Sequence, residues 1–165
     1  MSVNLSGFQL QDDHFFTELT QLAQRHPFNP GEIVLEVKES IIMQSSMVTL
    51  ARLKKIADLG FHLAIDDFGT SYSSLHYLNT LPIKTLKIDE AFIKGLPLEP
   101  GNLAVCEAII HMAEALKMSV IAEGVETPEQ MQWLHRKGVL CAQGYFYTKA
   151  LPAEDFAPFL GVRHS

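Results

Sequence analysis

Two adjacent carboxylates, Asp66 and Asp67, follow an apolar run in the segment Phe61–Leu75, whose sequence is FHLAIDDFGTSYSSL. The apolar run predicts a buried strand, and the small residues after the pair predict a loop. Carboxylates at the end of a buried strand are costly unless a proton or a cation neutralises them. For an isolated pair, the alternative is a solvated strand end with Asp67 in a turn. Because other strands of this chain also end in polar residues, we interpret the pair as one wall of a metal site.

The apolar segments of the chain predict six strands, around residues 3–6, 33–37, 61–66, 85–89, 119–123 and 140–143. In proteins built from βα units, the carboxyl ends of successive strands meet at one face, where active sites lie. Acidic, amide and basic side chains occupy these strand ends, namely Asn4, Glu36, Asp66, Asp67, Lys87, Asp89, Glu123 and Gln143. Their recurrence predicts a functional site at this face.

Helices must connect these strands and position their ends. Apolar residues at helical spacing, together with capping residues, predict helices from Asp12 through Leu22, from Ser45 to Gly60, and over 73–81, 102–117 and 127–138, with a last turn over 154–160. Six repeats of strand and helix with nearly continuous apolar strands predict a parallel sheet covered by helices. We therefore expect an α/β protein with a single domain over residues 1–165.

Composition restricts the class of protein further. The chain has 165 residues, of which 47% are hydrophobic, and a net charge of −6, which argues against a partner that is a polymeric nucleic acid. No apolar run approaches a membrane span and no signal peptide is apparent, so we expect a cytoplasmic location. Cys106 and Cys141 are interpreted as reduced core residues, Trp133 as core, and the seven histidines as surface or packing residues.

Six motifs in order resemble those of the EAL family of bacterial cyclic di-GMP phosphodiesterases. They are VNLS (3–6), LEVKES (35–40), DDFGTSYSSL (66–75), LKID (86–89), AEGVET (122–127) and AQGYFY (142–147). The resemblance covers essentially the whole chain. It implies a TIM-like (βα) barrel and metal-dependent cleavage of one phosphodiester of cyclic di-GMP to give linear pGpG. The implied cofactors are two Mg²⁺ or Mn²⁺ ions, which hard oxygen ligands select.

The motifs also imply roles for individual residues. The metal ligands implied are Asn4, Glu36, Asp66, Asp67 and Glu123. The catalytic residues implied are Asp67, which bridges the second metal position and the attacking water, Lys87, which holds this water and the phosphate, and Glu123, as ligand or general base. The supporting residues around the site are Glu39, Asp89, Glu126 and Gln143, and Glu39 matches the residue that anchors the DDFG loop.

The chain departs from the family pattern at several points. No strand carries the Glu-Ala-Leu motif that names the family and supplies a metal ligand. Lys38 replaces a usual threonine, and its ammonium could reach the carboxylates because it shares a strand face with Glu36. Ser71 replaces a usual glycine. About six βα units make an incomplete barrel, since eight units and about 250 residues are typical.

An incomplete barrel leaves two open edges, at the first and the sixth strand. Another chain, self-association, or the rest of a longer protein could cover them. Because exposing apolar surface to water costs free energy, we expect a homo-oligomer, such as a dimer. The residues expected to line the inner or the outer face of the sheet are Val3, Leu35, Leu63, Ile65, Leu86, Ile121 and Leu140.

Two classes of function remain open. The first is a cyclic di-GMP phosphodiesterase that is weak or inactive as this chain alone. The alternative is a non-catalytic module that binds cyclic di-GMP or docks a partner. A (βα) enzyme acting on another phosphodiester is a third, remote option, because the same metal pair would serve it.

Overall fold

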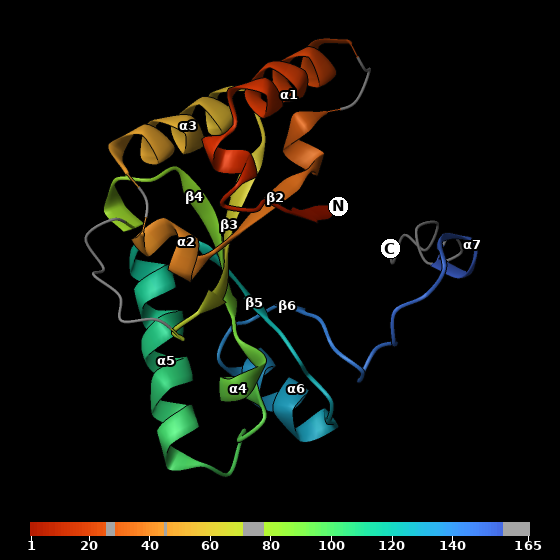
Figure 1. Ribbon diagram of the computed structural model, residues 1–165. Helices are drawn as coiled ribbons and strands as arrows, with labels where there is room; N and C mark the ends of the chain where they lie inside the picture. Colours follow the sequence, from red (N-terminus) through yellow and green to blue (C-terminus); the bar gives the residue numbers. More distant parts are fainter. Residues whose placement is uncertain (26–28, 45, 71–77, 157–165) are drawn as a thin grey trace.

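The computed structural model of the chain describes residues 1–25, 29–44, 46–70 and 78–156. Parallel strands and helices alternate along these residues (Figure 1). The strands are β1 (Ser2–Asn4), β2 (Val34–Lys38), β3 (His62–Phe68), β4 (Ile83–Ile88), β5 (Ser119–Ala122) and β6 (Cys141–Ala142). The helices are α1 (Asp13–Arg25), α2 (Glu39–Met43), α3 (Met47–Asp58), α4 (Glu90–Ile93), α5 (Pro100–Ala115), α6 (Pro128–Arg136) and α7 (Ala153–Phe156).

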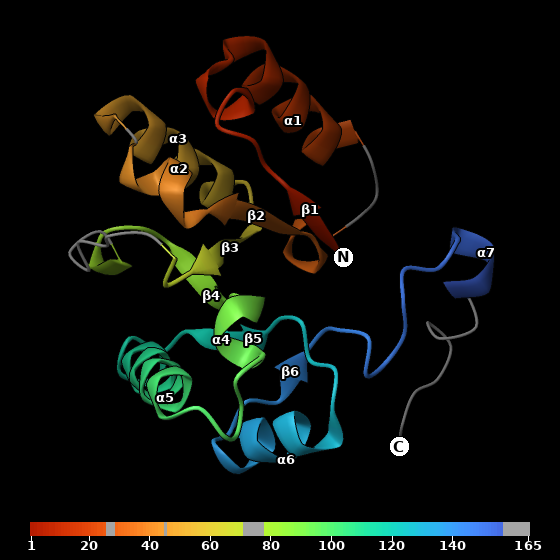
Figure 2. The ribbon, with the colours of Figure 1, turned by 60° about the horizontal axis from the view of Figure 1, so that its bottom comes forward.

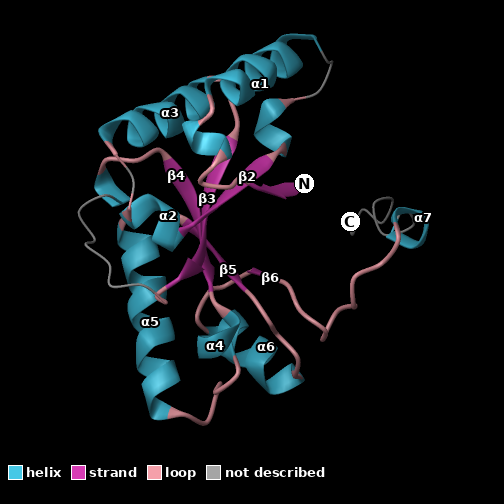
Figure 3. Cartoon of the chain, viewed as in Figure 1, coloured by secondary structure: helices cyan, strands magenta, loops and turns pink. Residues whose placement is uncertain are grey.

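All six strands belong to one parallel sheet, in the order β1-β2-β3-β4-β5-β6. The sheet twists strongly in Figure 3, and Figure 2 shows it curving from β1 round to β6 with α1, α3, α5 and α6 on its outer side. Parallel neighbours in sequence order are the pattern of a (βα) barrel, and six strands form an open half-barrel. The predicted α/β fold, a TIM-like barrel of about six βα units, is confirmed.

Capping residues set the starts of the helices that the sequence predicts. Ser46 accepts a hydrogen bond from the Thr49 N–H at the start of α3, and Thr127 and Gln130 form a reciprocal capping box at the start of α6. Each interaction satisfies backbone N–H groups that lack partners in the first turn. No helix in the described ranges is long and apolar enough to cross a membrane.

The two faces of the sheet differ in chemistry. Leu35, Leu63 and Leu86 are buried on the face covered by the helices, and Ile65 of the same strand parity is buried with them. The opposite face carries Glu36 and Lys87, whose side chains contact each other at 2.7 Å. These four residues, which were expected on the inner or the outer face, therefore pack on the outer face under the helices, because strand alternation places them opposite the carboxylates.

The edge strands are short and exposed. Every residue of β1 is exposed, including Val3 at 43%, and Leu140 beside β6 is 76% exposed. The interpretation of both cysteines as core residues is wrong for Cys141. Cys106 is buried, but Cys141 is exposed because the two-residue strand β6 has a neighbour on one side only among the described residues. Trp133 is buried, as predicted.

Some predicted elements differ from the structure. Two short helices, α2 and α4, begin directly after β2 and β4, where the sequence analysis places only strand ends. The predicted helix over 73–81 lies largely outside the described residues, as do Ser71 and the last four residues of the turn predicted over 154–160. After β6 the chain runs away from the sheet towards α7 (Figures 1 and 2).

Candidate active site at the carboxyl ends of the strands

Lys87, on β4, lies at the centre of a carboxylate cluster. Its Nζ donates a hydrogen bond to Glu36 Oε2 at 2.7 Å, and it lies 2.9 Å from Asp66 Oδ1 and 2.8 Å from Glu123 Oε1. The side chain of Lys87 is 4% exposed, and its three partners are 8 to 14% exposed. Four neighbouring strand ends of the sheet therefore contribute one buried cation and three buried or nearly buried acids.

A bulge in β3 brings the two adjacent aspartates to the same site. Neighbouring residues of a regular strand point to opposite faces. Here Ile65 pairs with Leu86 and Phe68 with Ile88, so β3 uses one residue more than β4 over the same distance. Asp67 also has φ +54°, in the left-handed region that side chains other than glycine seldom adopt. This local geometry explains how both carboxylates reach one cluster.

Lys38, at the end of β2, reaches the cluster as the sequence predicts. Its Nζ donates a hydrogen bond to Asp67 Oδ2 at 2.6 Å. The side chain of Lys38 is 59% exposed and that of Asp67 is 32% exposed, so this pair lies at the solvent side of the site. Lys38 occupies the register position opposite Asp66 in the β2–β3 ladder, which directs it towards the bulge.

Two further polar residues support this arrangement. The fully buried Glu39, at the start of α2, accepts a hydrogen bond through Oε2 from the Gly69 N–H at 3.1 Å, which ties α2 to the loop after β3. Gln143 donates through Nε2 to Glu123 Oε1 at 2.7 Å. Glu39 and Gln143 thus contact the DDFG loop and a cluster carboxylate, respectively.

The proximity of these charges shifts their pKa values. Burial raises the pKa of Glu123 to about 7 even though Lys87 opposes this shift. Burial also acts to raise the pKa of Asp66, but the positive charge of Lys87, whose Nζ lies 2.9 Å from Asp66 Oδ1, outweighs it, and the pKa lies below its ordinary value. Burial acts to lower the pKa of Lys87, yet its carboxylate partners raise it well above the ordinary value. The hydrogen bond to Asp67 raises the pKa of Lys38.

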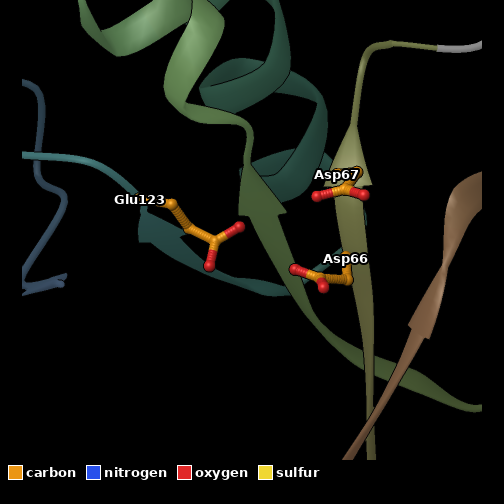
Figure 4. A group of neighbouring side chains, drawn as sticks. All are labelled: Asp66, Asp67 and Glu123. Atoms are coloured by element: carbon orange, nitrogen blue, oxygen red, sulfur yellow. The ribbon is translucent and has the colours of Figure 1, made fainter. Parts of the chain in front are cut away.

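The cluster has the composition of a site for a hard divalent cation. Oxygen atoms of Asp66, Asp67 and Glu123 lie within 4.8 Å of one another, and Figure 4 shows the carboxylates of Asp66 and Glu123 pointing towards each other. Asp66 Oδ1 is buried and accepts no hydrogen bond of suitable geometry within the described part of the chain, although Lys87 Nζ lies nearby. An oxygen-only donor set with a buried oxygen of this kind fits Mg²⁺ or Mn²⁺.

The remaining predicted residues lie at varying positions relative to this cluster. Asn4 is exposed and pairs in register with Glu36 on the neighbouring strand β2. Asp89 caps α4 by accepting from the Ala91 N–H at 2.8 Å. The letters Glu-Ala-Leu do occur at 114–116, but they end helix α5 and Glu114 is exposed, so they do not contribute to the site.

A cavity of about 450 Å³ adjoins the cluster at Gln143 and Glu126. Its other lining residues include Glu90, Tyr145 and Lys149, which the sequence analysis does not single out. Tyr145 lies within the AQGYFY motif, and this position is a signal that could have identified it. Lys149 Nζ lies 5.7 Å from the centre of the Tyr145 ring, which places a cation and an aromatic ring beside the acids.

Sequence comparisons find close relatives of this chain. The EAL domain family matches residues 1–150. The bifunctional diguanylate cyclase/cyclic di-GMP phosphodiesterase MucR of Pseudomonas aeruginosa is 37% identical over 155 residues, which are 94% of this chain and 23% of MucR. The cyclic di-GMP phosphodiesterase PdeR of Escherichia coli is 35% identical over 156 residues, which are 94% of this chain and 24% of PdeR. The chain thus spans about a quarter of the length of these relatives.

Solved structures of similar proteins share the fold of this chain. The PaMucR phosphodiesterase in complex with c-di-GMP superposes with a TM-score of 0.88 at 37% identity, covering 94% of this chain and 63% of that chain. Klebsiella pneumoniae BlrP1 in its manganese and cyclic di-GMP complex superposes with a TM-score of 0.80 at 27% identity, covering 88% of this chain and 37% of that chain. The chain belongs to the EAL domain family and holds part of that domain.

Proposed function

We propose that this chain supplies the catalytic face of a cyclic di-GMP phosphodiesterase that hydrolyses one phosphodiester to give linear pGpG. The observation that carries the proposal is the buried Lys87 surrounded by Glu36, Asp66 and Glu123, at the strand ends of an EAL-family half-barrel. The relatives that carry this activity in their names support the choice of substrate.

The proposed metal ligands are the residues that the motifs imply, Asn4, Glu36, Asp66, Asp67 and Glu123. When bound there, two Mg²⁺ or Mn²⁺ ions would lower the pKa of water and offset charge on the phosphodiester. The grouped oxygens of Asp66, Asp67 and Glu123 and the buried oxygen of Asp66 support three of these assignments, whereas those of Asn4 and Glu36 rest on the motifs. The manganese in the BlrP1 complex supports a divalent cation but does not decide between the two metals.

The protein groups have separate tasks in this proposal. Lys87 places a fixed positive charge beside the acids, where it can stabilise negative charge on the phosphate and hold the attacking water. Asp67 lies towards solvent and can orient that water. Gln143 keeps the Glu123 carboxylate aimed into the cluster, and Glu39 holds the loop that follows Asp67.

We further propose that residues 1–165 alone hydrolyse cyclic di-GMP at least about 100-fold more slowly than a closed EAL barrel, which corresponds to a few kcal/mol of barrier. Within the described residues, β1 and β6 each have one neighbouring strand, so the sheet does not surround the site. No strand of the described residues carries a Glu-Ala-Leu motif, so the metal ligand that the family motif would supply is missing from this set. The rate of catalysis falls steeply when a catalytic group is displaced by about 1 Å from its position relative to the substrate.

The test is hydrolysis of cyclic di-GMP with Mn²⁺, followed by chromatography of pGpG, alongside calorimetry with Mn²⁺ alone. We expect Mn²⁺ binding to residues 1–165 and slow formation of pGpG that Lys87→Ala abolishes. Asp66→Asn should remove most Mn²⁺ binding. An unchanged isotherm in that variant would overturn the assignment of Asp66, and fast turnover by residues 1–165 would overturn the proposed impairment.

A non-catalytic cyclic di-GMP-binding or docking module is the second candidate. Two lysines, Lys87 and Lys38, already neutralise the carboxylates through ion pairs of 2.6 to 2.9 Å, so the cluster is partly balanced by protein cations. Binding of cyclic di-GMP with no pGpG, in the presence of Mn²⁺, would favour this candidate.

We also propose that a second copy of the chain covers the open edges in a homodimer. Exposed Val3 at β1 and Leu140 at β6 support this, because both edge strands combine apolar side chains with a backbone edge that pairs with no other strand of the described residues. The loop around the DDFG motif is another surface that the family links to dimer contacts, but residues 71–77 lie outside the described part.

The free thiols of Cys106 and Cys141 support a reducing compartment such as the cytoplasm.

A further inference from the structure

Lys38 and the proposed metal site share one carboxylate. The Lys38 Nζ lies 2.6 Å from Asp67 Oδ2, and Asp67 is one of the three acids whose oxygens lie within 4.8 Å of one another. The other two acids, Asp66 and Glu123, have Lys87 as their cation. Asp67 therefore has a different counter-ion from the other two acids. Its counter-ion is Lys38, which lies at the end of β2 and on the solvent side of the site.

The side chain of Lys38 reaches the acids from the position just before α2. Lys38 is the N-cap residue of α2, but its side chain makes no capping hydrogen bond. Its ammonium extends instead towards Asp67, and the negative charges of Asp66 and Asp89 also act on it. The side chain thus contributes a positive charge to the cluster.

We propose that Lys38 is a built-in counter-ion of Asp67 that weakens the binding of a divalent cation to this carboxylate. This inference rests on the proposed function, because it assumes that Asp66, Asp67 and Glu123 bind metal. Lys38 competes for Asp67 Oδ2 directly and repels a second positive charge nearby. It thereby sets the metal concentration at which the cluster fills.

The position of Lys38 sets the size of the effect. Its side chain is 59% exposed, so water screens its charge and the repulsion is much weaker than between buried groups. We expect the removal of this ammonium to tighten Mn²⁺ binding on the order of tenfold, the size that repulsion between an exposed ammonium and a nearby divalent ion produces in a water-like dielectric.

The experiment is isothermal calorimetry with MnCl₂ on the wild-type chain and two variants at Lys38. Lys38→Met keeps the length of the side chain and removes its charge, whereas Lys38→Arg keeps the charge. Threonine is avoided because it would add a helix cap at this position. We expect the methionine variant to bind Mn²⁺ on the order of tenfold more tightly than wild type, and the arginine variant to bind like wild type.

Lys137→Met is the matched control. Lys137 forms an exposed ion pair with Glu107, also at 2.6 Å, and the substitution changes the net charge by the same amount. Its Mn²⁺ isotherm should equal that of wild type. Equal tightening in the Lys137 and Lys38 methionine variants would show an effect of net charge and would overturn the proposal.

Two further outcomes separate this inference from the proposed function. If Asp66→Asn loses Mn²⁺ binding while Lys38→Met binds like wild type, the metal site stands and the role of Lys38 is overturned. If neither wild type nor Lys38→Met binds Mn²⁺, the metal site itself is overturned, and the role of Lys38 with it. Tightening in both the methionine and the arginine variants would point to a structural effect and would also contradict the proposal.

Discussion

The buried carboxylate of Glu39 accepts a hydrogen bond from the backbone N–H of Gly69 at 3.1 Å. Glu39 begins α2, whereas Gly69 follows the two aspartates of β3. Gly69 has φ +97°, and a Cβ at this position would lie 2.9 Å from the Phe92 ring, so the loop closely approaches α4 here. The hydrogen bond thus holds the backbone next to Asp67 in a conformation that few residues could adopt.

We predict that Glu39→Ala lowers the free energy of unfolding by about 1–3 kcal/mol, because it leaves the Gly69 N–H without this acceptor in a buried setting. The same variant should weaken Mn²⁺ binding, because Asp67 lies two residues before Gly69. Urea denaturation and calorimetry measure the two effects. Glu39→Gln retains an acceptor oxygen and should lose less stability; equal losses in both variants would contradict the role of this hydrogen bond.

Lys87 gives a second prediction, which concerns charge balance. Lys87→Met removes the cation from three buried or nearly buried carboxylates and should lower the free energy of unfolding by about 3–5 kcal/mol in EDTA. Because a divalent cation bound to these acids would replace the lost charge, Mn²⁺ should restore part of this stability. Urea denaturation with and without Mn²⁺ measures both effects.

The control for this prediction is Lys94→Met. Lys94 forms an exposed ion pair with Glu90 at 3.5 Å, and its loss should change stability by less than about 1 kcal/mol. A Lys87→Met variant that is as stable as this control in EDTA would show that the acids do not need Lys87 in the metal-free protein.

The strands and the long helices can be predicted from the sequence because they depend on local patterns. Apolar runs formed β2 to β5, and the capping box at Thr127 started α6 as predicted. The convergence of polar residues at the strand ends follows from the parallel topology, so it could also be predicted from the sequence. These elements account for most of the fold and for the identity of the cluster.

The parts that were missed depend on contacts between distant strands. The bulge at Asp66 and Asp67 results from the pairing of β3 with β4, which no local pattern shows. The exposure of Cys141 depends on the position of β6 at an edge of the sheet, although its neighbours in sequence are apolar. Helix α2 was missed because the residues before it form a strand that leads directly into its first turn.

The two cysteines give a third prediction. Burial raises the pKa of the Cys106 thiol to about 11, whereas Cys141 is exposed. At pH 8 and submicromolar protein, one thiol per chain should react quickly with a disulfide reagent, and the second should react only after denaturation. Cys141→Ser should remove the fast reaction, while Cys106→Ser should retain it. Two fast thiols in the native wild type would contradict the burial of Cys106.

The last prediction concerns assembly at the two edges of the sheet. Strands β1 and β6 each pair on one side only among the described residues, and Val3 and Leu140 expose apolar surface beside them. Burying such surface is favourable by about 25 cal/mol for each Å² of apolar area. A dimer in which a second chain covers both edges would therefore be stabilised relative to two separate chains. Light scattering should therefore report a dimer at micromolar concentration.

The reactivity of Cys141 supplies an independent measure of the same contact, because this residue belongs to β6. In a dimer that covers β6, the fast thiol reaction should slow as the protein concentration rises, in parallel with the mass from light scattering. Leu140→Lys places a charge at this edge and should shift both transitions to higher concentration, whereas Leu98→Lys, at another exposed leucine, should shift neither. A monodisperse monomer at all concentrations, with constant reactivity of Cys141, would show that no second copy covers these edges.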